Sequence, residues 1–261
     1  MQKLKPIKNL GQNYLIDPNI IRKFVNTINP QSDDVIIEIG PGKGAISREL
    51  LHKCRKLIAI DIDKRIIEPL KNDLPEIDLI NDDFLKIDLQ KIIATGKVKV
   101  VGNIPFNLTS PILFKLVENI HLIQSASFIM QHEVAKRICA GIGTKEYGIL
   151  TVILNYIARP EYCFKISPNV FYPRPKVDSA VLKIEFNESV IHSIDLALFI
   201  KVVKASFGNR RKTLKNSLSN SIFGAYDLSQ LKINLNVRAE QMSIEEFLDL
   251  TREIKKFADK Q

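Results

Sequence analysis

The run from Asn103 to Pro111, Asn-Ile-Pro-Phe-Asn-Leu-Thr-Ser-Pro, places an amide, main-chain carbonyls and an aromatic ring within four residues. The Asn103 side-chain oxygen and the carbonyl of Ile104 or Pro105 can each accept a proton from an amine. Phe106 can stack on a flat ring. The run follows a strand-like apolar stretch, and open α/β sheets bind ligands at the carboxyl ends of strands. We therefore expect Asn103, Pro105 and Phe106 to hold a nucleobase by its exocyclic amine.

A second aromatic ring comes from the proline-rich run Phe171-Tyr172-Pro173-Arg174-Pro175. Prolines stiffen this loop, so Phe171 is well placed to cover the other face of the base. A base held between two rings lies outside a stacked duplex, so the substrate is single-stranded or the base is flipped. The alternative is structural: Pro105 turns the chain and Phe106 fills the core.

A glycine-rich loop, Gly40-Pro41-Gly42-Lys43-Gly44, joins a strand-like run to a helical pattern. Glycines let the main chain approach a ligand, and N–H groups at the start of a helix face it. Asp61 ends the next predicted strand, where a carboxylate can bind both ribose hydroxyls. The pattern predicts an adenosine-containing cofactor, although a dinucleotide also fits Gly40-x-Gly42-x-x-Ala45.

Three features favour S-adenosylmethionine over a dinucleotide. Pro41 and Lys43 between the glycines, and Glu38 before them, suit a loop around an amino-acid tail rather than a pyrophosphate. The Asp82-Asp83 pair follows the third predicted strand and offers a carboxylate to an adenine amino group. Alternatively, one of these two acids only closes a turn.

Methyl transfer to an exocyclic amine must localise a lone pair that is spread into the aromatic ring. Two acceptors on one nitrogen favour a pyramidal geometry with the lone pair aimed at the sulfonium. A strong base is unnecessary because the amine becomes acidic once alkylated. Most of the rate comes from holding nitrogen and methyl group at near-attack distance.

Short β-rich runs alternate with helical patterns in the first half of the chain, which is typical of a parallel sheet with crossover helices. We predict an α/β, Rossmann-like S-adenosylmethionine-dependent methyltransferase fold, with Asp63 as the N-cap of a helix starting at Lys64. Predicted strands are 35–39, 56–60, 78–80, 98–102 and 125–130, and an edge pair at 162–165 and 181–186 could complete the sheet. Predicted helices are 45–52, 64–72, 85–94 and 111–118.

The pattern changes after Phe186, where a linker-like stretch, 187–193, precedes helical patterns only, at 196–205, 211–223 and 244–257. We predict an S-adenosylmethionine-binding catalytic domain, residues 1–187, and a small all-helical RNA-contacting domain, residues 188–261. Six basic residues without an acid between them are candidates for RNA binding: Lys201, Lys204, Arg210, Arg211, Lys212 and Lys215. A second basic stretch contains Lys3, Lys5 and Lys8. The alternative for each is a solvated face.

Composition narrows the class of protein. The chain has 261 residues and a net charge of +9, which favours a polyanionic partner. No apolar run reaches the roughly 18 residues of a spanning helix, and no signal-peptide core is visible, so we expect a cytoplasmic protein. The three cysteines are widely spaced, and the run His132 to Lys136 lacks the second histidine of a zinc helix. We predict no disulfide and no metal site.

These motifs together resemble those of the small-subunit ribosomal RNA adenine dimethyltransferases. The matching segments are Gly11 to Leu15, Glu38 to Gly42, Asn103 to Phe106, Gln131 to Arg137, Pro173 to Ser179 and Asn209 to Thr213. The resemblance implies dimethylation of two adjacent adenines in a hairpin loop near the 3′ end of small-subunit ribosomal RNA, on a late assembly intermediate, with S-adenosylmethionine as donor.

By the same resemblance, the cofactor would contact Asn13, Leu15, Gly40, Asp61, Asp83 and Asn103. The family's usual motif has Tyr where this chain has Phe106, and often a longer acid where it has Asp61. Stacking and ribose binding should survive these changes. We therefore assign Phe106 a stacking role only.

Three other functions remain open at this point. The related large-subunit ribosomal RNA dimethyltransferase of macrolide resistance shares the donor loop, but Tyr147-Gly148 and the basic segment after Asn209 favour the small-subunit type. A non-catalytic RNA-binding or transcription factor of the same fold would not need an intact Asn103 to Phe106. An NAD-linked oxidoreductase would need a proton-transferring partner that the sequence does not show. We expect a monomer.

Overall fold

The computed structural model describes residues 5–258, so Lys3 of the N-terminal basic stretch lies outside the described residues. Contacts between residues divide the chain into two compact units. One holds the chain up to residue 135 together with residues 160–186, and the other holds residues 136–159 and the chain from residue 187. The segment 136–159 thus groups with the C-terminal helices, and the predicted domain boundary after residue 187 stays a prediction.

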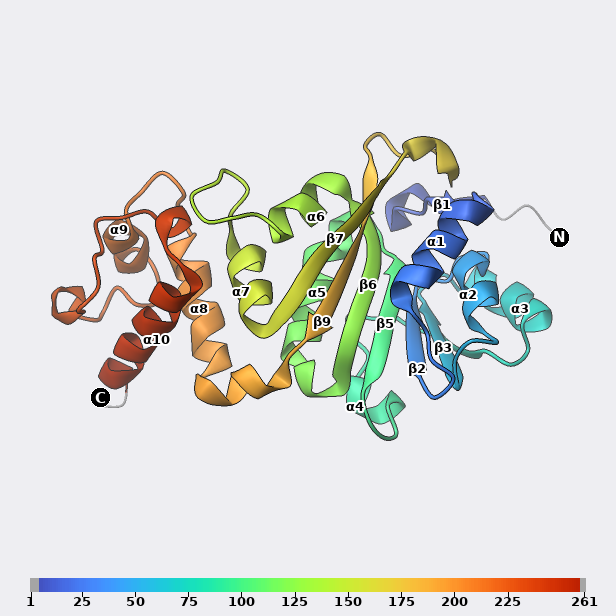
Figure 1. Cartoon of the computed structure of the whole chain (residues 1–261), viewed down its shortest axis with the longest axis horizontal. Coiled ribbons are helices and arrows are strands. Elements are labelled where there is room, and N and C mark those ends of the chain that lie inside the picture. The colour runs from blue at the N-terminus through green and yellow to red at the C-terminus, as the bar shows by residue number, and fades with distance from the viewer. Residues whose placement is uncertain (1–4, 259–261) are drawn as a thin grey trace. The chain divides into compact units, whose positions relative to one another are not determined.

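The described residues form a seven-stranded sheet in the order β4-β3-β2-β5-β6-β9-β7 (Figure 1). Strands β4, β3, β2, β5 and β6 are parallel to their neighbours, whereas β9 runs antiparallel to β6. The predicted α/β class and the late strand pair at the sheet edge are confirmed. The strands are β2 Val35–Ile39, β3 Lys56–Asp61, β4 Asp78–Asn81, β5 Val98–Asn103, β6 Ile123–Gln131, β7 Ala158–Ile166 and β9 Ser179–Phe186.

The central strands are buried and mostly apolar, as expected for a parallel sheet covered on both faces, although β2 carries Glu38 and β5 carries Lys99. In β2 and β5 nearly every residue is buried. Helix α1 packs on α2 and against β6 and β9, and its Phe24 and Val25 join the core. The helices of this part are α1 Pro18–Ile28, α2 Ala45–Leu50, α3 Lys64–Asp73, α4 Leu89–Ile92, α5 Thr109–Glu118 and α6 His132–Ile138.

Aspartates cap three of these helices, α1, α3 and α4. Asp17 accepts hydrogen bonds from the N–H groups of Asn19 and Ile20, and Pro18 occupies the first helical position. Asp63 accepts the Arg65 N–H at 3.1 Å, which confirms the predicted N-cap of α3. This cap has a second role in the site described below.

Two predicted helices are shorter than expected because side chains close turns inside them. The prediction for residues 85–94 is wrong at its start: Asp83 accepts the N–H of Leu85 at 3.0 Å, and the helix begins only after Asp88, which caps α4. The prediction for 211–223 is also wrong at its ends. The Asn209 side chain accepts the Arg211 N–H at 3.2 Å, so the basic residues before Leu214 form a loop.

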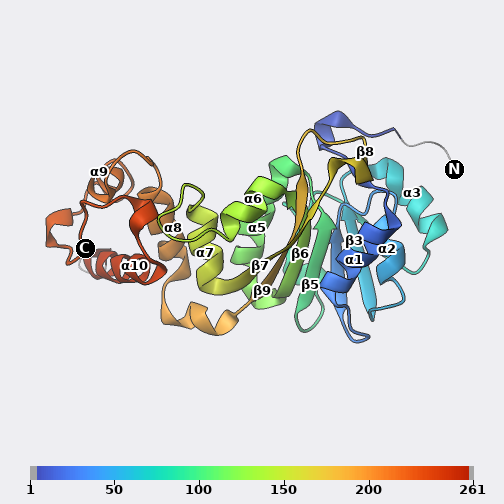
Figure 2. The ribbon, with the colours of Figure 1, turned by 45° about the horizontal axis from the view of Figure 1, so that its top comes forward.

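A two-stranded sheet joins distant parts of the chain. Strand β1, Tyr14–Leu15, pairs antiparallel with β8, Phe171–Tyr172, with Tyr14 opposite Tyr172 and Leu15 opposite Phe171 (Figure 2). The sequence did not predict this pairing, because two residues on each side carry no periodic signal. It places the N-terminal motif beside the loop of Phe171.

The second unit is helical. Helix α8, Leu196–Ser206, contacts α7, Ile149–Ile157, α9, Leu214–Ser219, and α10, Ile244–Ala258, around buried Phe199 and Phe247. The sequence missed α7, because its run Ile-Leu-Thr-Val-Ile-Leu is almost entirely apolar and resembles a buried strand. Short 3-10 helices lie in both units, at Lys8–Leu10, Phe106–Leu108, Ile120–Leu122, Pro168–Val170, Glu188–Ser193, Leu228–Gln230 and Ala239–Gln241. Across residues 5–258, no helix is long and apolar enough to cross a membrane.

Candidate active site

A cavity of about 300 Å³ opens at the carboxyl ends of β2, β3, β4 and β5, within the first unit. This is the position at which α/β sheets bind ligands, and the volume is in the range of small-molecule sites. Nine of the predicted site residues line it: Asn13, Gly40, Gly42, Asp61, Asp83, Asn103, Pro105, Phe106 and Phe171. The structure therefore brings the two predicted half-sites together in one cavity.

The glycine loop forms one wall. Gly40, Gly42 and Gly44 all have positive φ angles, of 67°, 54° and 73°, which side chains rarely tolerate. A Cβ atom on Gly42 would lie 2.9 Å from the ring of Tyr14. Gly42 therefore lets the N-terminal segment close against the loop.

Asp61 offers a carboxylate at the end of β3. The residue is 8% exposed and its Oδ1 accepts the Asp63 N–H at 2.8 Å. Burial raises the pKa of Asp61, while hydrogen bonds from the main chain of Asp63 and Gly42 oppose that rise. An ionised carboxylate can accept hydrogen bonds but cannot donate them. This side chain therefore suits a ligand that carries hydroxyl donors.

Asp83 follows β4 and has two roles that the sequence had left as alternatives. Its side chain closes the turn to Leu85, and it also lines the cavity beside Ile62 and Phe84. Ile62 is 55% exposed, which is unusual for a large apolar side chain. An apolar wall with a carboxylate at its edge suits a flat heterocycle bearing an amino group.

Asn103 ends β5, and its side-chain orientation is set by one hydrogen bond. Its Nδ2 donates to the Asn13 carbonyl at 2.7 Å, which leaves Oδ1 as an acceptor for a ligand. The Pro105 carbonyl already accepts the Leu108 N–H at 3.0 Å. Of the two carbonyls considered from the sequence, this favours that of Ile104 as the second acceptor.

The two predicted stacking rings differ in burial. Phe106 is half-buried and lines the cavity, so it does not serve only to fill the core. Phe171 is 4% exposed, because it packs into the core cluster while it also lines the cavity. The cavity thus has one ring that is accessible and one that is held firmly in the wall.

Two predicted cofactor residues lie behind the cavity wall. Leu15 is 5% exposed in the core cluster, and Glu38 is 1% exposed beneath the glycine loop. Glu38 Oε2 accepts the Ser47 hydroxyl at 2.6 Å, while Oε1 has no hydrogen-bond partner among the described residues. Burial raises the pKa of Glu38 to about 7, and the charge of Asp61 adds to that rise. Contact of these two side chains with a cofactor stays a prediction.

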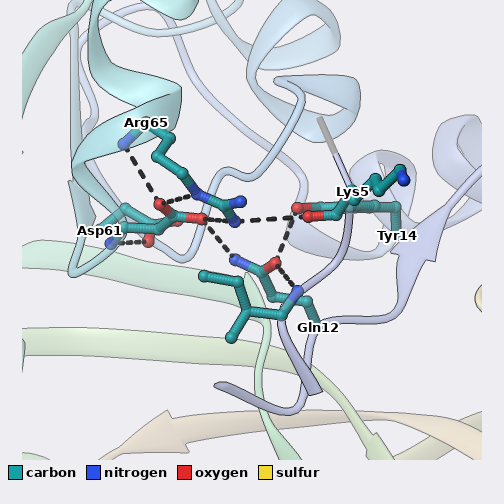
Figure 3. A network of polar contacts seen from close by, with 7 residues as sticks. Lys5, Gln12, Tyr14, Asp61 and Arg65 are labelled. Atoms are coloured by element: carbon teal, nitrogen blue, oxygen red, sulfur yellow. Dashed lines mark hydrogen bonds and ion pairs between the residues drawn. The ribbon is translucent and has the colours of Figure 1, made fainter. Parts of the chain in front are cut away.

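The sequence missed part of the cavity wall. Gln12 and Tyr14 line it, as do Phe84, Pro175 and Ser179. Gln12 belongs to a polar network at the end of β3 (Figure 3). Gln12 and Tyr14 could have been found from their place beside Asn13 in the N-terminal motif. Only the pairing of β1 with β8 shows why that motif reaches the site.

The six basic residues predicted to bind RNA are all exposed, in α8, in the loop after it and in α9. Arg210 differs from the others, because its guanidinium donates to the carbonyls of Lys145 at 2.5 Å and Tyr147 at 3.2 Å. It therefore ties parts of the second unit together. Within the described part of the chain, no cluster of His, Cys, Asp and Glu could hold a metal ion.

Comparisons with known proteins agree with the geometry of the cavity. The model of the ribosomal RNA adenine dimethylase family matches residues 4–256. Ribosomal RNA small subunit methyltransferase A of Chlorobium phaeobacteroides is 44% identical over 253 residues, which cover 97% of this chain and 95% of that protein. The protein of the same name from Alkaliphilus metalliredigens is 40% identical and covers 97% of this chain and 93% of its own length.

Solved structures show the same fold over nearly the whole chain. A dimethyladenosine transferase from Plasmodium falciparum has a TM-score of 0.79 at 25% identity and covers 94% of this chain and 98% of its own. The 23S rRNA methyltransferase ErmE has a TM-score of 0.69 at 25% identity and covers 93% and 100%. The family match and the curated relatives lead to one conclusion: the chain belongs to the ribosomal RNA adenine dimethylase family.

Proposed function

We propose that this chain transfers methyl groups from S-adenosylmethionine to the exocyclic amines of two adjacent adenines in a hairpin loop near the 3′ end of small-subunit ribosomal RNA, dimethylating each. The family match and the curated relatives, which are named as small-subunit enzymes, support the reaction and the subunit. The precursor of the small subunit is the proposed substrate particle, and the enzyme would act as a cytoplasmic monomer.

The cavity has the groups that the methyl donor requires. S-adenosylmethionine supplies a methyl group bonded to a positively charged sulfur. Asp61 would accept hydrogen bonds from the ribose hydroxyls, and Asp83 would accept one from the adenine amino group. The loop at Gly40 and Gly42 would surround the amino-acid tail, and Asn13 would complete the wall. The positive φ angles of the glycine loop fit a ligand that the main chain must approach closely. The buried Glu38 carboxyl, whose Oε1 has no partner among the described residues, also fits such a ligand.

The target amine would be held by two acceptors. Asn103 Oδ1 and the Ile104 carbonyl would each accept a hydrogen bond from one N–H of the unmethylated amine. The nitrogen lone pair would then point away from both acceptors, toward the sulfonium. After the first transfer only one N–H remains, so the methylated amine needs just one acceptor for the second. Because alkylation makes the amine acidic, no cavity residue has to act as a strong base.

Phe106 and Phe171 would enclose the adenine, with stacking of the accessible Phe106 ring contributing about 1–3 kcal/mol. The two rings leave no room for neighbouring bases of a duplex. The loop adenines of a hairpin, which are unpaired, are therefore better substrates than paired ones.

The observation that supports this proposal is the hydrogen bond from Asn103 Nδ2 to the Asn13 carbonyl, because it uses the donor of the amide and leaves Oδ1 as the acceptor for a target amine. The test is methylation of immature small subunits with labelled S-adenosylmethionine, followed by mapping of the modified positions. We expect dimethyladenine at two neighbouring sites. Label found only in large-subunit RNA would refute the proposed small-subunit substrate.

We propose that the exposed basic residues bind the RNA backbone: Lys201, Lys204, Arg210, Arg211, Lys212 and Lys215. Replacing Arg211 and Lys212 by Gln should weaken RNA binding and reduce its salt dependence, since each lost phosphate contact lowers the salt slope by about one. If RNA affinity and its salt dependence do not change, this loop is only a solvated face. Arg210→Gln should weaken RNA binding and, in addition, lower thermal stability, because Arg210 bonds two carbonyls of its own unit.

A further inference from the structure

Gln12 is the centre of a polar network that joins the N-terminal segment to the end of β3 (Figure 3). Its Oε1 accepts the Ile7 N–H at 2.8 Å and the Tyr14 hydroxyl at 2.9 Å. Its Nε2 donates to Oδ2 of Asp63 at 3.0 Å. One amide side chain thus bonds two groups of its own segment and one carboxylate from a distant part of the chain.

The carboxylate end of this network is rigid. Asp63 accepts two hydrogen bonds from the Arg65 guanidinium, at 2.8 and 2.7 Å, and its own N–H donates to Asp61. The bonds from Arg65 hold the pKa of Asp63 at about 2, so this group is ionised and can only accept. Since Asp63 cannot donate and the Ile7 N–H cannot accept, the Gln12 amide has a single orientation that satisfies all its partners.

From Gln12 the network reaches three walls of the cavity. Through Asp63 it contacts Asp61, the proposed ribose ligand. Through Tyr14 it holds the ring that lies against Gly42. Through the next residue in the chain, Asn13, it positions the carbonyl that orients the Asn103 amide.

We propose that Gln12 is a positioning residue that couples donor binding at Asp61 to the alignment of the target-gripping amide of Asn103. This inference rests on the proposed methyl transfer. When Gln12 is in place, the main chain at Asn13 is fixed relative to the end of β3, so the ribose carboxylate and the amide oxygen keep a constant separation. Without it, the N-terminal segment loses its only side-chain bond to Asp63 in the described structure.

The matched pair of variants is Gln12→Ala and Gln12→Glu. Alanine removes all three hydrogen bonds. Glutamate keeps an acceptor for Ile7 and Tyr14 at almost the same size, but it replaces the donor to Asp63 with a second carboxylate. Gln90, an exposed glutamine on α4 outside the cavity, provides the control through Gln90→Ala and Gln90→Glu.

For Gln12→Ala we expect both a rise in KM for S-adenosylmethionine and a fall in kcat, each of about tenfold, as for the loss of a bonded group inside a network. The two changes test different halves of the proposal. A changed KM with an unchanged kcat at saturating RNA would overturn the link to Asn103. A changed kcat with an unchanged KM would overturn the link to Asp61.

Gln12→Glu supplies a readout that a merely structural contact would not give. The new carboxyl would lie against the Asp63 carboxylate, with Asp61 close by, and both oppose its ionisation. The cations around it are Arg65, Lys5, whose carbonyl accepts a hydrogen bond from Arg65, and Lys43, which lies over the Tyr14 ring. The pKa of the new carboxyl should therefore be raised, and when protonated it can donate to Asp63 as the amide does. We expect the activity of this variant, relative to the native chain, to recover as the pH falls from about 8 to about 6.

An activity ratio that is the same at every pH, or native kinetics in both variants, would overturn the proposal. Binding of S-adenosylmethionine without RNA, measured by calorimetry, separates this result from a failure of the proposed function. If the native chain does not methylate small subunits, the function fails. If Gln12→Ala then still binds the donor as tightly as the native chain, the positioning role fails as well.

Discussion

The two halves of the cavity are built in different ways. The donor half consists of strand ends: the glycine loop after β2, Asp61 after β3 and Asp83 after β4. Its geometry follows from the sheet itself and from main-chain angles. The target half depends on contacts between distant segments, because Asn103 is oriented by Asn13 and Phe171 is held by the pairing of β8 with β1. Substitutions in the donor half should therefore act on binding and stability, and those in the target half on turnover.

Asn103→Ala gives the largest expected effect and the clearest test of this contrast. Loss of the amide oxygen removes one of two acceptors for the target amine, so kcat should fall by about a thousandfold, the upper end of the loss when one group that stabilises a transition state is removed. Binding of RNA should change little. Steady-state kinetics and calorimetry measure the two effects separately.

Asn103→Asp refines the same test. The acid keeps an acceptor oxygen but cannot donate to the Asn13 carbonyl, so the side chain loses the bond that orients it. We expect a smaller fall than for alanine, of about a hundredfold. Equal turnover in Asn103→Asp and the native chain would mean that the amide orientation has no part in catalysis.

Much of the donor half could be predicted from the sequence, and less of the target half. The run ending at Ile39, the glycines and Asp61 are close together in sequence and obey local rules, so their position at the sheet edge followed from strand patterns alone. The N-terminal motif carried no such pattern. Asn13 reaches the cavity only because two residues pair with Phe171 and Tyr172, a contact between segments more than 150 residues apart.

The misjudged helices have a similar cause. Asp83 and Asn209 each accept a main-chain N–H two residues later, which ends or delays a helix that the apolar spacing predicted. Side chains of Asp and Asn compete with helical hydrogen bonds in this way, but the sequence does not tell which of many such residues does so. Helix α7 was missed because a helix that is apolar on most sides looks like a buried strand.

Gly42→Ala should damage the donor half without direct loss of a reacting group. The new Cβ would lie 2.9 Å from the Tyr14 ring at a φ of 54°, so either the loop or the N-terminal segment must move. We expect donor affinity to fall about 10- to 100-fold, from roughly 1–3 kcal/mol of backbone strain and displacement. Gly96→Ala is the matched control, because its φ is 75° but no atom lies within 4 Å of the added Cβ. If both variants lose the same donor affinity, the cause is general backbone strain and not the contact with Tyr14.

Glu38→Gln tests whether the buried carboxyl of the donor half makes the free energy of unfolding depend on pH. Burial raises the Glu38 pKa from an ordinary value of 4.5 to about 7, so between these values the folded chain holds a proton that the unfolded chain has lost. The free energy of unfolding contributed by this group is therefore highest at low pH, falls as the pH rises through that window and levels off above about 7.

Glutamine cannot ionise, so the stability of Glu38→Gln should not show this fall, which amounts to roughly 3 kcal/mol. Urea unfolding of the variant and the native chain at several pH values measures the difference between them. Glu68→Gln, an exposed change on α3, is the control and should follow the native curve. Parallel curves for Glu38→Gln and the native chain would show that Glu38 keeps its charge in the folded state.

The smallest effect is expected from Phe106→Tyr, which separates the role of the ring from that of the hydroxyl in the family's usual motif. Phe106 is half-buried, lines the cavity and begins the 3-10 turn after Pro105. If the ring only stacks, Phe106→Ala should lower turnover on RNA by about 10- to 100-fold, which corresponds to 1–3 kcal/mol of base stacking, whereas Phe106→Tyr should stay within about twofold of the native chain. Steady-state kinetics with a hairpin substrate compares the three. A gain well beyond twofold in Phe106→Tyr would show that the native ring leaves a useful hydrogen bond unmade, and the target half would then depend on polar groups beyond Asn103.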